Sequence, residues 1–185
     1  MKKIRKFEGK VSLLAISRSP TDYLDEAMFN VPMSFDYSLD YDVIDFRKQP
    51  SLYRMGKGEQ GVLLVQPYKS ELLPLWRFKT PELAKQSAQA LSQKFLDYKS
   101  KNDFVGMDMA RKFVQMGYTR SRRYANHKSG RKWSEGRVSV LPKDEDPLKA
   151  ASAEIFKQVL AQINSDTYYL ELMRQHKLNS NPSRR

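Results

Sequence analysis

Hydrophobic residues in the second half of the chain recur at helical spacing. Thr80 followed by Pro81 is typical of a helix start, and apolar residues then recur on one face from Ala84 to Phe95. A second helix is predicted to open at Asp103. Its expected buried stripe consists of Val105, Met109, Phe113 and Met116. Gly117 follows this stripe and either ends the second helix or is tolerated inside it.

Two further helices are predicted toward the end of the chain, over residues 147–163 and 166–176. A loop of about residues 127–142 separates them from the second helix. The polar residues 179–185 are expected to form a disordered basic tail.

The first half of the chain favours strands. Residues 11–16 (VSLLAI) and 75–79 (LWRFK) each predict a short strand, and residues 51–66 predict a hairpin around a glycine-rich turn. The second arm of that hairpin, GVLLVQ, is continuously apolar, as a strand buried on both faces would be. Residues 41–46 fit a turn or an edge strand. Ser19 and Pro20 predict the start of a short helix that ends near Phe29, followed by a loop.

These elements predict an α+β fold, in which a small, mainly antiparallel sheet from the N-terminal half is packed by helices of the C-terminal half. We expect residues 1–178 to form a single domain, because 185 residues suffice for one core.

Composition narrows the class of protein. The absence of cysteine excludes disulfides, thiolate metal ligands and a cysteine nucleophile, and it fits a reducing compartment. The basic opening of the chain leads into only a short apolar run, interrupted by Glu8 and Lys10, so a signal peptide is not expected. No apolar stretch approaches the roughly 18–20 residues of a membrane span. We therefore expect a cytoplasmic protein that does not associate with a membrane.

The net charge of +12 favours a polyanionic partner, and its distribution is uneven. Residues 2–10 hold five Lys or Arg and one Glu, for a net charge of +4. Residues 21–46 hold seven acidic residues and no Lys or Arg, for a net charge of −7. Residues 111–137 hold nine Lys or Arg and one Glu, for a net charge of +8. The sequence does not decide whether the acidic 22–45 block faces the basic segment.

The basic segment has helical order if the helix continues past Gly117. Arg111, Gln115, Tyr118 and Arg122 are then spaced by four, three and four residues and share one face. Phe113, Gly117 and Tyr124 fall on the opposite, core-facing side. The alternative interpretation is a solvated helix face followed by a flexible basic loop. For Arg120, on the buried side, pairing with a carboxylate of the acidic block is a further alternative.

The loop after this helix continues the charge and adds hydrogen-bond donors. Arginine forks, lysines and hydroxyl or amide groups together suit phosphate recognition, and aromatic rings can stack on unpaired bases. Tyr118, Tyr124 and Trp133 are the aromatic candidates, although Tyr124 fits the core better. The candidate polyanion-binding residues are Arg111, Gln115, Tyr118, Arg122, Arg123, Asn126, His127, Lys128, Ser129, Arg131 and Lys132.

Catalytic patterns are weak. The chain has two histidines, His127 and His176, far apart in sequence, and neither is expected to bind a metal. The glycine-rich residues 56–61 lack the GK[ST] ending of a phosphate-binding loop and precede an apolar run, so they fit a turn. We therefore expect no metal and no cofactor, and the catalytic residues, if any, are unknown. A carboxylate-only magnesium site from Asp40, Asp42 and Asp45 stays open as the alternative.

Two long motifs carry a family resemblance: FDYSLDYDVIDFRKQPSLYRMGKGEQGVLLVQPYKSELLPLWRFKTPE and DFVGMDMARKFVQMGYTRSRRYANHKSGRK. With the helix between them they span about residues 35–132, and the chain there resembles the domain of unknown function 4385 family, found in bacteria, some viruses and some eukaryotes. The resemblance implies a common fold and a cytosolic setting. It implies no activity and no catalytic residues.

Three hypotheses follow. The first is a non-enzymatic protein that binds nucleic acid, DNA or RNA, along residues 111–137, with residues 2–10 as an added contact. The second is a metal-dependent enzyme acting on a phosphorylated or nucleic-acid substrate. It requires Asp42 or Asp45 to share a cleft with Arg122 or Arg131. The third is an interaction module for an acidic protein partner.

Overall fold

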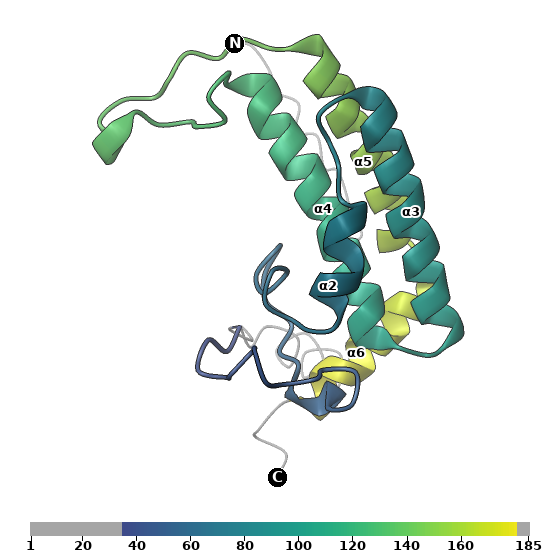
Figure 1. The fold of residues 1–185 in the computed structure, drawn as a ribbon. Coiled ribbons are helices and arrows are strands. Elements are labelled where there is room, and N and C mark those ends of the chain that lie inside the picture. Colours follow the sequence, from purple (N-terminus) through teal and green to yellow (C-terminus); the bar gives the residue numbers. More distant parts are fainter. Residues whose placement is uncertain (1–34, 181–185) are drawn as a thin grey trace, which may run out of the picture. The chain divides into compact units, whose positions relative to one another are not determined.

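A computed structural model describes residues 35–180 and places five α-helices in this range (Figure 1). They are α2 (Tyr68–Leu72), α3 (Pro81–Ser100), α4 (Phe104–Asn126), α5 (Pro147–Asn164) and α6 (Thr167–Asn179). Three single-turn 3₁₀ helices accompany them: η1 (Pro50–Leu52), η2 (Leu73–Leu75) and η3 (Glu135–Arg137). Residues 35–180 contain no sheet, and their one β-bridge joins Trp133 to Val140. The predicted α+β class is therefore wrong, and this part of the chain is all-α.

The predicted hairpin at residues 51–66 is instead a series of turns. Gly61 has a φ of +82° and its carbonyl accepts bonds from the backbone N–H groups of Leu64 and Val65, at 3.0 and 3.2 Å. Val62 and Val65 are buried, whereas Leu63 between them is 43% exposed. The apolar run therefore buries residues three apart, as a tight turn does, and a continuous run of four apolar residues fits both this pattern and a buried strand.

The predicted strand at residues 75–79 is also wrong, although its alternation is present. The segment is extended at Trp76, and the N–H of Arg77 donates to Ser87 Oγ on α3 at 3.0 Å. Trp76 and Phe78 are partly buried against the core, while Arg77 and Lys79 are exposed. An extended chain lying on a helix alternates its side chains just as a strand does. Residues 41–46 form turns, which was one of the two predicted alternatives.

The helix predictions are confirmed, including their starts. Thr80 Oγ1 accepts from Leu83 N at 3.3 Å at the start of α3, and Asp103 Oδ1 accepts from Gly106 N at 2.9 Å at the start of α4. The predicted apolar stripes of both helices are buried. The predictions for residues 147–163 and 166–176 correspond to α5 and α6. The predicted strand at 11–16, the first helix, the 2–10 basic block and the 181–185 part of the tail lie outside the described residues.

Helix α4 is the central element of the described part. It packs against α3 and α5 along its length, and α2 and α6 contact it as well (Figure 1). The helix runs unbroken through Gly117, where an added Cβ would lie 2.5 Å from the Phe156 ring on α5. Gly117 therefore lets two helices approach closely and does not end α4. The described residues all belong to one compact unit, and the predicted 1–178 domain boundary stays a prediction.

Candidate functional site

The predicted basic face of α4 divides into two regions that differ in exposure. Arg111 is only 13% exposed, and its Nε donates to Asp108 Oδ1 and to Tyr169 OH, both at 2.9 Å. Its Nη1 donates to Gln115 Oε1 at 2.7 Å, as the predicted four-residue spacing allows. Tyr118 packs partly buried against the core. Arg111 and Gln115 therefore belong to a mostly internal network, and Tyr118 packs at the edge of the core.

Asp108 is the centre of this internal network. Its carboxylate is fully buried and accepts hydrogen bonds from Tyr53 OH, from Tyr169 OH at 2.7 Å and from Arg111. Burial alone would raise the pKa of Asp108, but the charges of Arg111 and Lys112 and the two hydroxyls outweigh it and hold the pKa well below its usual range. The carboxylate is therefore ionised in the folded protein.

Lys112 is the second cation held inside the core. Its side chain is fully buried, with Nζ 2.8 Å from the backbone oxygen of Gln60 and 3.5 Å from Asp108 Oδ2. Burial lowers the pKa of Lys112, against the opposing effect of Asp108. One buried carboxylate thus faces two cations, and Tyr53 and Tyr169 supply its remaining hydrogen bonds. We name Asp108, Arg111, Lys112, Tyr53 and Tyr169 the buried charge cluster.

The last turns of α4 present their cations to solvent. Arg122 Nη1 pairs with Glu145 Oε1 at 2.7 Å, and both side chains are at least a third exposed. Such a pair contributes little to stability because solvent screens it. Arg123 is exposed and has no ion pair within residues 35–180. Arg120 is partly buried and likewise has no ion pair with residues 36–45.

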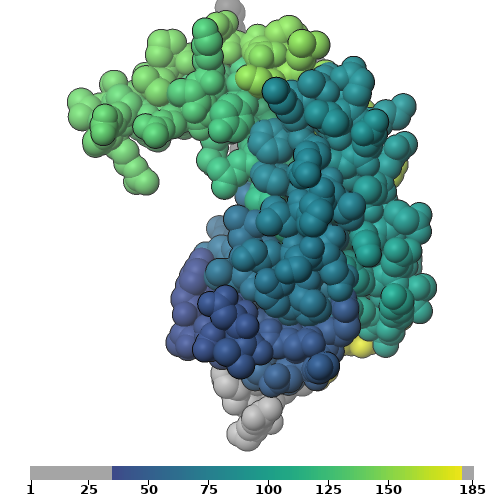
Figure 2. Space-filling model, in the orientation of Figure 1, coloured from purple at the N-terminus to yellow at the C-terminus, as the bar shows by residue number. Residues whose placement is uncertain are grey.

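Beyond α4, residues 127–143 form an arm that extends away from the helices (Figures 1 and 2). Backbone bonds tie its base, since Asp144 N donates to Asn126 O at 3.1 Å. His127 Nδ1 lies 3.1 Å from Pro142 O, so the ring of this predicted residue holds the two sides of the base together. Bonds from Ser134 N to Ser139 O and from Leu141 N to Lys132 O order the outer part, at 2.9 and 2.8 Å. Hydrogen bonds at its base and in its outer part therefore hold the two sides of the arm together.

The charge of the arm is open to solvent. None of its five cations has an ion pair with another residue of the described part of the chain, and Glu135 is its one acidic residue. These cations are Lys128, Arg131, Lys132, Arg137 and Lys143. Trp133 is 43% exposed, and Lys132 Nζ lies 5.8 Å from its ring centre. Ser129 Oγ accepts from Arg131 N at 3.3 Å, which closes the turn around Gly130. Cations and an aromatic ring thus share one projecting ribbon.

Tyr124 links the arm to the helices. Its ring lies 6.1 Å from the ring of Phe78, and Gly130, with a φ of +68°, packs so closely that a Cβ there would lie 2.6 Å from it. Tyr124 therefore packs on Phe78 and Gly130, but it is 37% exposed and lies outside the core, so its predicted core position is wrong. Phe78 brings the exposed Arg77 and Lys79 next to the base of the arm. Sequence reasoning missed these two cations, although their alternation with Trp76 and Phe78 was the available signal.

The acidic residues of the first described turns do not join this surface. Asp45 pairs with Lys48 at 3.6 Å, in a segment that lies toward the end of α4 away from the arm (Figure 1). Neither Asp42 nor Asp45 has an ion pair with Arg122 or Arg131. No group of three or more His, Asp or Glu within residues 35–180 has the arrangement of a metal site. The structure does not bring together the residues that the metal-enzyme hypothesis requires.

Comparisons with known proteins give a family and no function. No helix in the described range combines the length and hydrophobicity that crossing a bilayer requires. No curated protein and no solved structure matches the chain. The model of the family described as domain of unknown function (DUF4385) matches residues 36–179, which is most of the chain. The resemblance carried by the two long motifs is thereby confirmed, and the chain belongs to the DUF4385 family.

Proposed function

We propose that this protein binds nucleic acid through the arm, the exposed end of α4 and the adjacent Arg77 and Lys79. The observation that carries the proposal is the set of unpaired cations beside the exposed Trp133 on a projecting ribbon. Such cations can bind phosphates without first giving up an ion pair within the protein. Base rings can stack on exposed aromatic side chains.

Geometry divides the predicted residues into two groups. Arg123, Lys128, Arg131 and Lys132 are exposed and available to phosphates, with Ser129 and Asn126 nearby as polar groups. Arg122 is available once its exposed bond to Glu145 opens. Arg111 and Gln115 bond each other inside the protein, and Tyr118 packs on the core. Binding therefore depends on the arm more than on the first turns of α4.

The test is the salt dependence of binding to a short duplex DNA and to a single strand of the same sequence. Each phosphate contact contributes about −0.9 to the slope of log affinity against log salt on duplex DNA. The triple variant Lys128→Gln, Arg131→Gln and Lys132→Gln should flatten this slope by up to about 2–3. A matched control, Lys48→Gln, Lys57→Gln and Lys85→Gln, removes the same charge from exposed positions outside the arm.

Two outcomes would contradict the proposal. One is the absence of binding at low salt, and the other is an equal loss of affinity in the arm variant and the control, which would indicate attraction to net charge alone. Trp133→Ala separates stacking from charge, since stacking contributes about 1–3 kcal/mol per base and only single strands expose base faces. If the arm instead captures an acidic protein, co-purified protein will survive nuclease treatment and the duplex will not compete for it.

A further inference from the structure

A pocket of about 640 Å³ opens at the end of α4 away from the arm. The last turns of α3, the turn that joins α3 to α4, the 47–50 turn and His176 of α6 line it. Its volume lies in the range of small-molecule sites, which is about 300–1,000 Å³. The nucleic-acid proposal makes no use of this pocket, because the two regions are separated by the length of α4.

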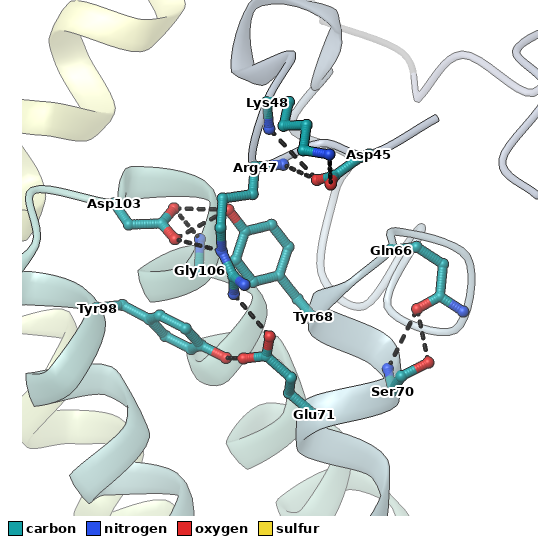
Figure 3. A network of polar contacts seen from close by, with 10 residues as sticks. All are labelled: Asp45, Arg47, Lys48, Gln66, Tyr68, Ser70, Glu71, Tyr98, Asp103 and Gly106. Carbon is teal, nitrogen blue, oxygen red and sulfur yellow. Dashed lines mark hydrogen bonds and ion pairs between the residues drawn. The ribbon is translucent and has the colours of Figure 1, made fainter. Parts of the chain in front are cut away.

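One wall of the pocket is a tied polar network, drawn in Figure 3. Arg47 Nη2 pairs with Glu71 Oε1 at 2.8 Å and its Nε lies 3.7 Å from Asp103 Oδ2. Tyr98 OH donates to Glu71 Oε2 at 2.7 Å, and Tyr68 OH donates to Asp103 Oδ1 at 2.8 Å. Each of the two carboxylates therefore accepts from one tyrosine hydroxyl, and both share the guanidinium of Arg47. Four elements meet in this wall, which holds it in a fixed geometry.

Hydrogen bonding decides the ionisation of Glu71. Burial works against its charge, but the hydrogen bonds from Tyr98 and Arg47, together with the charges of Arg47 and Lys94, outweigh burial and lower the pKa of Glu71. The network sets two carboxylates against one guanidinium, and the hydroxyls of Tyr98 and Tyr68 supply further hydrogen bonds to those carboxylates.

Two lysines that flank Tyr98 on the same side of α3 also line the pocket. Lys94 and Lys101 line the pocket, and neither has an ion pair with another residue of the described range. Asp97 lies between them in sequence, and its Oδ1 accepts from Gln93 Nε2 at 3.0 Å. The lining as a whole is neutral, with three Lys or Arg against three Asp or Glu, and Arg47 is the cation that the two carboxylates of the network share. Lys94 and Lys101 are therefore the cations of the lining that are available to an anion.

The remaining surface is aromatic and apolar. Phe104 and Val105 line the pocket, and the Phe104 ring lies 4.7 Å from the ring of His176. His176 Nε2 lies 2.8 Å from the backbone oxygen of Tyr53, which can only accept, so Nε2 carries the proton. Burial lowers the pKa of His176, so the neutral ring keeps Nδ1 as an acceptor. A ligand hydroxyl can donate to this nitrogen.

We propose that this pocket binds a small organic anion with an aromatic or other apolar body, its acid group held by Lys94 and Lys101 and its body packed on Phe104. The shared chemistry covers carboxylates and phosphate monoesters. The pre-formed Arg47–Glu71–Tyr98 wall limits the size of the ligand.

The test titrates the full-length protein with benzoate, 4-hydroxybenzoate, phenyl phosphate, inorganic phosphate and benzylamine, following backbone amides of residues 94–105 by NMR. At least one aromatic anion should bind saturably, more tightly than inorganic phosphate and benzylamine. The double variant Lys94→Gln and Lys101→Gln should weaken that binding at least about tenfold, which corresponds to about 1.4 kcal/mol. The control Lys57→Gln and Lys85→Gln should leave it unchanged.

The outcomes separate the two ligand classes and the two proposals. Binding of phenyl phosphate alone assigns a phosphate monoester, and binding of a benzoate alone assigns a carboxylate. No saturable binding by any aromatic anion, equal binding of benzylamine, or an equal loss in both double variants would overturn the proposal. Nucleic-acid affinity, measured on the same variants, should not distinguish the pocket variant from its control, so either proposal can fail without the other.

Discussion

The two halves of α4 treat the same residue types in opposite ways. In the first half, Arg111 and Lys112 are enclosed with Asp108 and two tyrosines. In the second half and the arm, Arg123, Lys128 and Arg131 reach solvent without ion pairs in the described part of the chain. The cations of the first group are paired with a buried carboxylate, whereas those of the second group are free to bind a ligand. A run of cations in a sequence is therefore not one surface until the packing of its helix is known.

The largest expected effect is at the centre of the buried charge cluster. Asp108→Asn keeps the size of the side chain but leaves Arg111 and Lys112 without a counter-charge inside the core. Breaking a buried pair in this way costs about 3–5 kcal/mol. Urea unfolding should show this loss, and Asp97→Asn, a carboxylate nearer the surface, is the matched control. A loss below about 1 kcal/mol for Asp108→Asn would mean that the cluster is far better hydrated than its burial indicates.

The next largest effect is expected at Gly117, which lies at the boundary between the two halves of α4. Gly117→Val places methyl groups where the Phe156 ring now lies 2.5 Å from the position of a Cβ, so α4 and α5 must separate. Overpacking of this kind costs about 1–3 kcal/mol. Ala151→Val, at an exposed position of α5, controls for the lower helix propensity of valine. Thermal unfolding measures both, and equal melting temperatures would contradict the close contact.

The two histidines allow the two regions to be compared by the pH dependence of stability. Burial lowers the pKa of His176 below its ordinary 6.5, so on acidification the unfolded chain takes up a proton before the folded protein does. Stability should therefore fall as the pH drops below about 6.5 toward the folded-state pKa. His176→Gln should reduce this fall in urea unfolding between about pH 7 and pH 5. His127→Gln on the arm is the control, and an equal change in both variants would contradict the assignment to burial.

The smallest effect concerns the arm itself. The triple variant Lys128→Gln, Arg131→Gln and Lys132→Gln removes three exposed cations that contact no carboxylate of the described chain. Surface substitutions of this kind change stability by about 0.5 kcal/mol or less each. Urea unfolding should give the same midpoint as the unaltered protein to within that margin. A larger loss would show that the arm is part of the folded core and would remove the contrast with Asp108.

Helices were predictable from the sequence because their signals are local. The caps at Thr80 and Asp103 and the apolar stripes from Ala84 to Phe95 and from Val105 to Met116 depend on neighbours within a few residues. The long motifs likewise identified the family. The turns at 51–66 and the extended segment at 75–79 were mistaken for strands, because alternation and apolar runs do not reveal whether a partner strand exists.

What the sequence by itself determined is thus the position of the helices, the family and the location of the cationic segment. Only the tertiary structure decided which of those cations are available. Arg111 is internal because Tyr169 of α6 and Tyr53 of a distant turn close over Asp108. The arm is exposed because the chain returns to the end of α4 before α5 begins. Residues 127–143 are therefore left outside the packed helices. Burial depends on contacts between segments far apart in sequence, and spacing along one helix cannot record them.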